Sequence, residues 1–368
     1  MDRTIRSLRS TVRTAGFGGF IPSPSAYRRG MIRAERVLED VVRIRVEHPG
    51  TYIGHVNLYL IELDDGRLLV DSGFRQTAGE LVEELRRLIG GSRLETVLLT
   101  HIHNDHTGGA SEVATAFGPK VRMHQRDIDV IRFMRETVEG GGRQLKALGL
   151  DDSLREEVLG FFRFNLQHLS MGYEPLIGGE EFRSRAGRWR VVPTPGHTPG
   201  HVTLFDERRR VLISGDHLLP NETSNVSYYP MEGYDALRSY LGSLVLTEEL
   251  GPELVLPSHG EPFGNVRERI DYLFLHHEKR LREALASTGD GNSLMGVARG
   301  ISWSRGRFDG LGPIDRWLAL LETLAHLQFL INGGFVETRW DAGTVVYAAT
   351  GRDASEIKEV LEEIRRRG

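Results

Sequence analysis

The chain has 368 residues, which exceeds the usual size of one domain and predicts one large domain with a smaller one. Its composition is ordinary, with 39% apolar and 27% charged residues and a formal net charge of -4, so nothing in it indicates nucleic acid or a membrane surface as partner. Cysteine is absent, which excludes disulfides and means that any metal must be held by histidine and carboxylate. No run approaches the roughly 18 apolar residues that span a bilayer, and we expect a cytoplasmic protein.

The first 36 residues are rich in arginine. They hold eight arginines against Asp2 and Glu35, and they lack the apolar core of a secretory signal. We predict a basic, poorly ordered arm over residues 1–36; a transit-like segment is the other interpretation of this composition.

An antiparallel sheet is predicted to follow the arm. Apolar residues alternate from Val37 to Val46, a second strand is expected over Tyr52–Leu63, and a hairpin turn at residues 64–66 leads into a third strand over Arg67–Val70. Thr77–Ile89 has apolar residues at helical spacing, which predicts a helix with one buried face.

Thr100–Gly109 reads T-H-I-H-N-D-H-T-G-G and concentrates potential metal ligands. It follows the apolar, β-branched run Thr96–Leu99, which predicts a buried strand, and Gly108-Gly109 then allow a tight turn. The ligands would lie at the carboxyl end of a strand, where open sheets usually build their sites. Imidazole and carboxylate groups predict a divalent cation, with zinc, iron and manganese all compatible. The four candidates are His101, His103, Asp105 and His106.

Residues 125–178 are predicted to form an inserted, mainly helical cap between the histidine-rich loop and the loop that holds His197. Residues 125–180 hold seven basic against ten acidic residues, which does not suit a phosphate backbone. Aromatic residues of the cap are more often core than pocket, but their place between the loops favours an apolar substrate cleft for some of them. The candidate substrate contacts are Phe161, Phe162, Phe164 and Tyr173.

Two histidines and an aspartate farther along the chain each follow a predicted strand. His197 lies in a proline-stiffened loop between strands expected at residues 181–192 and 202–205, Asp216 follows residues 210–213, and His259 follows residues 254–256. This repeated placement is what two packed sheets that share one active-site edge would give.

A glycine-rich break at residues 289–292 predicts a domain boundary, so that residues 37–289 form the first domain and residues 290–368 the second. The second segment is predicted as helix, helix and hairpin, followed by a charged helix. Residues 290–351 hold five arginines and no lysine against six acids, which gives no basic stripe. We interpret this segment as a packing or dimerisation element, with a homodimer as one outcome, rather than a nucleic-acid binder.

The ordered motifs identify the chain as similar to the metallo-β-lactamase-fold hydrolase superfamily. The H-x-H-x-D-H run is its signature, and the other family motifs follow in order at residues 70–73, 195–201, 214–217 and 257–260. The resemblance implies an α+β fold, a four-layer αββα sandwich with the helical insertion. The second segment resembles the winged-helix domain of the β-lactamase-like-protein-2 branch, which is related to glyoxalase II and polyketide thioesterases.

The resemblance also implies a role for each candidate residue. His101, His103 and His197 would hold one metal ion, Asp105, His106 and His259 a second, and Asp216 would bridge them. Asp105 and Asp216 would act in catalysis, with a hydroxide shared by two divalent ions, most simply zinc, as the attacking group. Asp71 and His201 would orient ligating histidines through the ring nitrogens that do not bind metal. For His201, contact with substrate is the alternative.

The metal site predicts hydrolysis but leaves the bond open. An ester, thioester or lactone of a small acyl substrate is the first hypothesis, because the cap is aromatic and acidic. A single-strand endoribonuclease is the alternative, with the arginine-rich arm as its electrostatic handle. A metal-bearing binding protein without turnover is a third, which an intact ligand set disfavours.

Overall fold

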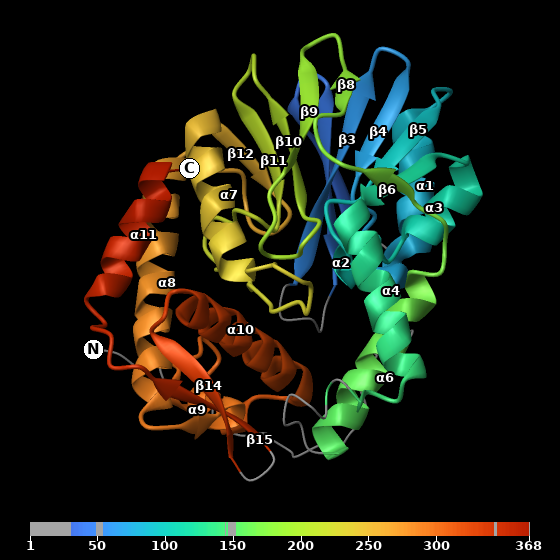
Figure 1. Ribbon diagram of the computed structural model, residues 1–368. Coiled ribbons are helices and arrows are strands. Elements are labelled where there is room, and N and C mark those ends of the chain that lie inside the picture. The colour runs from blue at the N-terminus through green and yellow to red at the C-terminus, as the bar shows by residue number, and fades with distance from the viewer. Residues whose placement is uncertain (1–30, 49–53, 144, 146–151, 342–343, 368) are drawn as a thin grey trace, which may run out of the picture.

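The computed structural model describes residues 31–48, 54–143, 145, 152–341 and 344–367, and two β-sheets form its centre (Figure 1). The first sheet has seven strands in sequence order: β1 (Ile32–Leu38), β2 (Val41–Glu47), β3 (His55–Leu63), β4 (Gly66–Val70), β5 (Leu94–Leu98), β6 (Lys120–His124) and β7 (Glu174–Leu176). The second has the order β12-β11-β10-β9-β8: β8 (Glu181–Arg183), β9 (Arg188–Pro193), β10 (Val202–Asp206), β11 (Val211–Gly215) and β12 (Leu254–Pro257).

The two sheets pack face to face through alternate residues of their strands. In β3, Tyr59 and Ile61 join a buried cluster with Trp189 of β9, whereas Leu58 and Leu60 belong to the core on the opposite face of the sheet. Successive side chains of a strand point to opposite faces, so strands that are apolar on both sides need a covering layer on each.

Helices supply the two outer layers. Helices α1 (Ala78–Ile89) and α3 (Ala110–Phe117) cover the first sheet, whereas α7 (Ala236–Leu250) and α8 (Val266–Thr288) lie beside the second (Figure 1). Leu81 and Leu85 of α1 are fully or nearly fully buried, as the spacing of its apolar residues predicted. The predicted αββα arrangement is therefore confirmed.

The segment between β6 and the second sheet is largely helical, as predicted. It contains α4 (Gln125–Glu139) and α6 (Asp152–His168). Its end differs from the prediction, because residues 174–176 form β7, which pairs in parallel with β6 and completes the first sheet. The insertion is thereby fixed to the sandwich at both of its ends.

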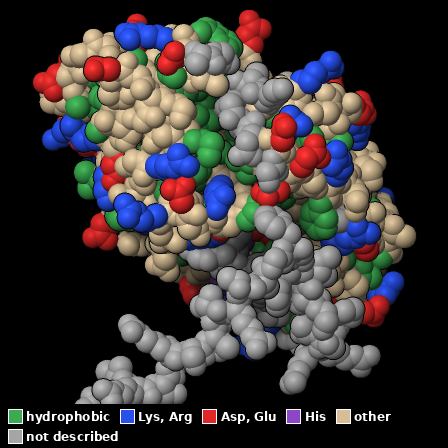
Figure 2. Space-filling view, turned by 90° about the horizontal axis from the view of Figure 1, so that it is seen from below, with side chains coloured by type: hydrophobic (Ala, Val, Ile, Leu, Met, Phe, Trp, Pro, Cys, Tyr) green, Lys and Arg blue, Asp and Glu red, His purple; other side chains and the backbone are tan. Residues whose placement is uncertain are grey.

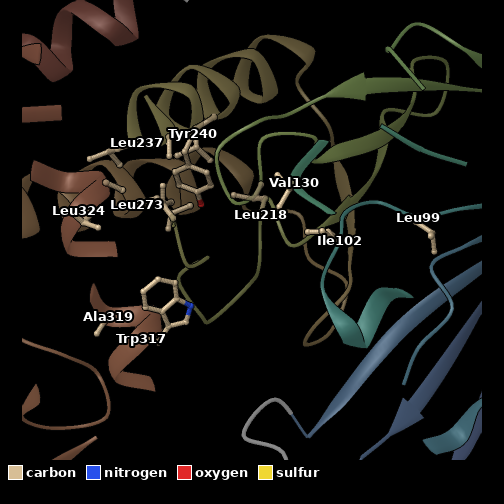
Figure 3. Packing of buried hydrophobic residues seen from close by; sticks show 14 of the residues in the cluster. Leu99, Ile102, Val130, Leu218, Leu237, Tyr240, Leu273, Trp317, Ala319 and Leu324 are labelled. Atoms are coloured by element: carbon tan, nitrogen blue, oxygen red, sulfur yellow. The ribbon is translucent and has the colours of Figure 1, made fainter. Parts of the chain in front are cut away.

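The C-terminal elements occur in the predicted order of helix, helix and hairpin. They are β13 (Asn292–Ser293), α9 (Leu294–Gly300), α10 (Pro313–Asn332), β14 (Val336–Asp341), β15 (Thr344–Ala349) and α11 (Glu356–Arg367). In Figure 3, Leu324 of α10 lies next to Leu237 of α7 and Leu273 of α8, and all three belong to one buried cluster. The boundary near residue 289 and the assignment as a winged-helix domain stay predictions.

The predicted opening of the first sheet was wrong in one respect. We expected a single strand over Val37–Val46 after an arm of residues 1–36, but Ile32–Leu38 forms β1 and pairs antiparallel with β2. The connecting residues are Glu39 and Asp40, which lack the glycine or asparagine that usually indicates a two-residue hairpin turn. Residues 1–30 of the predicted arm lie outside the described residues.

Candidate metal centre

The candidate ligands follow strands at the same edge of the sandwich. His101, His103 and the short helix α2 (Asn104–Thr107) follow β5, Asp216 follows β11, and His259 follows β12. Strands β4 and β5 are parallel, and so are β11 and β12, so their carboxyl ends collect at one edge of each sheet. This topology brings together residues that are up to 158 positions apart, from 101 to 259, in one cluster.

Three histidine rings form the first group of the cluster. Nε2 of His197 lies 3.2 Å from Nε2 of His101 and 2.9 Å from Nδ1 of His103, and the nitrogens of His101 and His103 are 3.0 Å apart. Burial lowers the pKa of His103 to about 3 and that of His101 well below its usual range. The rings are therefore neutral, which is the form that binds a metal ion.

The second group consists of Asp105, His106 and His259. Oδ2 of Asp105 lies 3.6 Å from Nε2 of His106 and 3.3 Å from Nε2 of His259. Potential ligand atoms of these three residues all lie within 4.8 Å of one another. The group is thus compact enough to hold one cation.

Asp216 lies between the two groups. Its Oδ2 is 3.6 Å from Nε2 of His197 and 3.9 Å from Nε2 of His101, whereas its Oδ1 is 3.4 Å from Nε2 of His106 and 3.3 Å from Nε2 of His259. Each carboxylate oxygen therefore faces a different group, which is the arrangement that a bridging ligand requires.

Hydrogen bonds behind His197 and His259 determine which ring nitrogen faces the cluster. Nδ1 of His197 donates to the carbonyl oxygen of Asn225 at 2.7 Å, and Nδ1 of His259 donates to the carbonyl oxygen of His55 at 2.7 Å. A carbonyl oxygen has no proton to give, so each Nδ1 carries the hydrogen. Each Nε2 is consequently the nitrogen that faces the cluster and is left for a metal ion.

Asp71 fixes two further rings. It follows β4 directly and has a left-handed backbone (φ 62°). Its carboxylate accepts hydrogen bonds from the N–H of Thr100 (2.7 Å), the hydroxyl of Thr100 (2.9 Å) and Nδ1 of His106 (2.8 Å). Because the Thr100 hydroxyl gives its proton to Asp71, Nδ1 of His101 donates to that hydroxyl at 3.0 Å. Nε2 of both His101 and His106 is therefore left free for a metal ion.

Four buried ligand atoms lack a hydrogen-bond partner within the described part of the chain, and a cation would supply a partner for them. Oδ2 of Asp105, Nε2 of His106, Oδ1 of Asp216 and Nε2 of His259 are all buried without a hydrogen-bond partner among the described residues. Burial opposes a charge on His259, but Asp216 and Asp105 outweigh it and raise the pKa of His259 to about 10. The carboxylates therefore favour positive charge at this point, and a metal ion would satisfy all four atoms at once.

The resemblance suggested that His201 orients a ligating histidine ring, but its hydrogen bond goes to the backbone of Asp216. Its Nδ1 is 2.9 Å from the hydroxyl of Thr194, and its Nε2 accepts a hydrogen bond from the N–H of Asp216 at 3.1 Å. Burial lowers the pKa of His201 well below its usual range, which keeps Nε2 an acceptor. His201 thus fixes the backbone of the residue between the two groups.

Asp127, at the start of α4, connects two ligand loops and was not singled out from the sequence. Its carboxylate accepts hydrogen bonds from the N–H of Ile102 (2.9 Å), the hydroxyl of Thr198 (2.8 Å) and the N–H of Gly200 (2.7 Å). Ile102 separates His101 from His103, and residues 198–200 follow His197. The only sequence signal for this role is an aspartate in the first turn of a helix that follows a strand.

Asn57 of β3 supports the loop of His259 and was not among the site residues predicted from the sequence. Its Nδ2 donates to the carbonyl oxygens of Pro257 (3.0 Å) and Gly260 (2.8 Å), and its N–H donates to that of Ser258 (2.7 Å). A buried asparagine in the middle of a strand is the signal that could have found it.

The four aromatic residues predicted to contact substrate differ in exposure. The Phe162 side chain is buried and packs against Trp317 of α10 at 6.2 Å between ring centroids, so it belongs to the core. Phe164 is 42% exposed, and Phe161 and Tyr173 are partly buried. The Tyr173 hydroxyl is buried without a hydrogen-bond partner among the described residues. Phe161, Phe164 and Tyr173 stay candidates for substrate contact.

A family model described as the metallo-beta-lactamase superfamily matches residues 51–259, which include every candidate ligand. Among solved structures, a beta-lactamase domain protein from Burkholderia ambifaria is 30% identical with a TM-score of 0.74, and the match covers 86% of this chain and 94% of that one.

Curated relatives include a probable metallo-hydrolase, YqjP, from Bacillus subtilis, which is 27% identical over 85% of this chain and 99% of its own length. A beta-lactamase-like protein 2 homolog from Caenorhabditis elegans is 24% identical over 68% of this chain and 72% of its own. An atrochrysone carboxyl ACP thioesterase, nsrC, from Aspergillus novofumigatus is 22% identical over 76% of this chain and 72% of its own.

Proposed function

The chain belongs to the metallo-beta-lactamase superfamily and is a metal-dependent hydrolase, and from its site we propose a dinuclear enzyme that hydrolyses an ester, thioester or lactone of a small molecule. The observation that carries the proposal is the position of Asp216, whose two carboxylate oxygens face the two ligand groups separately. A single-ion site would need only one of these groups.

The ligands would divide as the two groups do. His101, His103 and His197 would hold one ion, Asp105, His106 and His259 the other, with Asp216 between them. When bound, two such ions lower the pKa of a water molecule toward neutrality and polarise the scissile carbonyl group.

The carboxylates lie on the side of the cluster that solvent can reach. The side chains of Asp105 and Asp216 are 13% and 11% exposed, whereas those of His101 and His106 are fully buried. Asp105 would therefore hold the attacking water molecule and accept its proton, while the rings of His101 and His106 form the closed base of the site.

We propose zinc as the metal. Three imidazole nitrogens dominate the first group, and nitrogen-rich sites without thiolate suit zinc. The second group has relatively more oxygen, with which iron and manganese are also compatible. Metal analysis of protein purified without added metal would distinguish these ions.

Two observations support an acyl substrate. A relative with 22% identity over most of this chain carries the name of an acyl-carrier-protein thioesterase. The insertion between the ligand loops also places the apolar side chains of Phe161 and Tyr173 against the core without burying them fully. Partly exposed aromatic surface on an insertion between the two ligand loops suits an apolar acyl group.

An endoribonuclease is the alternative, and the charge distribution disfavours it. Arg299, Arg305 and Arg339 of the C-terminal segment each form an ion pair with an acidic residue. Figure 2 shows basic and acidic side chains interspersed over the described residues of one face, without a continuous basic area. Recognition of a nucleic-acid backbone requires such an area.

The test is thiol release from acyl thioesters of increasing chain length, with zinc-loaded protein and the Asp216→Ala variant as blank. We expect release that depends on Asp216 and increases with acyl size. Cleavage of single-stranded RNA without thiol or lactone turnover would favour the alternative instead.

No helix among the described residues is long and apolar enough to cross a membrane. Placement in the cytoplasm, a homodimer and the absence of a nucleic-acid partner remain predictions.

A further inference from the structure

Helix α10 holds the irregular segment that follows Asp216. Nδ2 of Asn225 donates to Oε2 of Glu322 on α10 at 3.0 Å, and the N–H of Tyr228 donates to the carbonyl oxygen of Leu321 at 3.0 Å. The other end of the Asn225 amide, Oδ1, accepts a hydrogen bond from the hydroxyl of Ser227 at 2.5 Å. Both ends of the Asn225 side chain are therefore fixed, one of them by the C-terminal part of the chain.

The backbone of the same residue orients a metal-ligand candidate. The carbonyl oxygen of Asn225 accepts the hydrogen of Nδ1 of His197 at 2.7 Å, and the hydroxyl of Ser224 lies 3.0 Å from the same nitrogen. The direction of this carbonyl group sets the ring plane of His197, and with it the direction of the Nε2 lone pair. A single residue, Asn225, thus contacts both Glu322 and His197.

We infer that Glu322 is a positioning residue of the metal centre, which holds Asn225 so that its carbonyl group orients His197. Glu322 lies 63 positions beyond residue 259, where the match to the family model ends, so the C-terminal segment would contribute to the site as well as to packing. The inference rests on the proposed role of His197 as a metal ligand.

The surroundings of Glu322 suit a hydrogen-bond acceptor whose specific partner is Asn225. Burial raises the pKa of Glu322, and the charge of Arg280 and the hydrogen bond from Asn225 oppose that rise. Glu322 therefore lies in a partly buried place, where fewer water molecules can replace a lost Asn225 contact.

The test compares the zinc affinity of four variants with that of the wild type, by competition with a chromophoric chelator. Glu322→Ala removes the acceptor, whereas Glu322→Gln keeps an amide oxygen at the same place. Asn225→Asp sets two carboxylates against each other, and the double variant Asn225→Asp with Glu322→Gln restores the hydrogen bond with donor and acceptor exchanged. Glu337→Ala, in an exposed ion pair with Arg339, serves as the control from the same segment.

We expect Glu322→Ala and Asn225→Asp to weaken the binding of one zinc ion by about tenfold, the lower end of the range for residues behind a ligand. Glu322→Gln and the double variant should bind zinc nearly as the wild type does, and so should Glu337→Ala. Thermal unfolding of the metal-free proteins, measured in parallel, reports any loss of packing.

Unchanged zinc affinity in Glu322→Ala, with or without a lower melting temperature, would reduce Glu322 to a packing contact and overturn the inference. Failure of the double variant to recover affinity lost in Asn225→Asp would also contradict it. A wild-type protein that binds no zinc, iron or manganese would instead refute the proposed function itself.

Discussion

Nδ1 of His106 donates a hydrogen bond of 2.8 Å to Oδ2 of Asp71, and this contact sets Nε2 of the same ring toward the metal centre. The other oxygen of Asp71 already accepts a hydrogen bond from the N–H of Thr100 at 2.7 Å. Both contacts therefore require a side chain with two acceptor oxygens, which a carboxylate has and an amide lacks. The choice of tautomer at His106 therefore depends on the charge of a residue that no metal ion would contact.

Asp71→Asn tests this dependence without a change of shape. The amide oxygen can still accept from Thr100, but the amide nitrogen would donate to Nδ1 of His106 and move the ring hydrogen to Nε2, where it blocks a metal ion. Asparagine also tolerates the left-handed backbone at this position. We expect metal affinity to fall roughly 10- to 100-fold, with nitrogen NMR shifts of His106 reporting the exchanged tautomer. Retained affinity together with the exchanged tautomer would contradict this role of Asp71.

Asp127 predicts a specific pH dependence of stability. Burial raises the pKa of Asp127 to about 7, against hydrogen bonds from Thr198, Gly200 and Ile102. In the unfolded chain the carboxyl group has a pKa of about 3.9. Its folded pKa is the higher one, so its contribution to stability is full below about pH 4 and is lost as pH rises to 7.

The measurement is the free energy of unfolding of metal-free wild type and of Asp127→Asn between pH 4 and 7. We expect the wild type to lose stability relative to the variant across this interval, because the variant cannot ionise. A difference that stays constant with pH would show that Asp127 does not titrate there.

Phe162 and Phe164 separate packing from substrate contact on a single helix. Phe162 is buried against Trp317, so Phe162→Ala should cost about 3–5 kcal/mol in the free energy of unfolding. Phe164 is 42% exposed, and Phe164→Ala should change that energy by less than about 0.5 kcal/mol.

The role of Phe164 in substrate binding is then tested by steady-state kinetics of Phe164→Ala and wild type, with the longest thioester that is cleaved. A higher KM with unchanged kcat in Phe164→Ala would assign this ring to the acyl site. Unchanged kinetics would remove Phe164 from the substrate candidates.

The sequence was informative where chemistry is local. The ligands follow apolar strands, and the run from His101 to His106 concentrates four of them in one loop. Gly109 also has a local reason, because a Cβ there would come within 2.3 Å of the carbonyl oxygen of Ser72. Such features are visible in composition and spacing alone.

Contacts between distant segments could not be predicted in the same way. Asp127 contacts Gly200, Asn57 contacts Gly260, and Glu322 contacts Asn225, at separations of 73, 203 and 97 residues. Each is a single polar residue in an otherwise ordinary helix or strand, and only the packing of the sandwich gives it a partner. The first hairpin was missed for a different reason, since its turn has charged residues instead of glycine.

The most direct test of the dinuclear proposal is thioester hydrolysis measured while zinc is added stepwise to the metal-free protein. We expect activity to reach its plateau at two zinc ions per chain, with no such rise in Asp216→Ala. Full activity at one ion per chain, or equal activity without metal, would contradict a site in which Asp216 joins two ions.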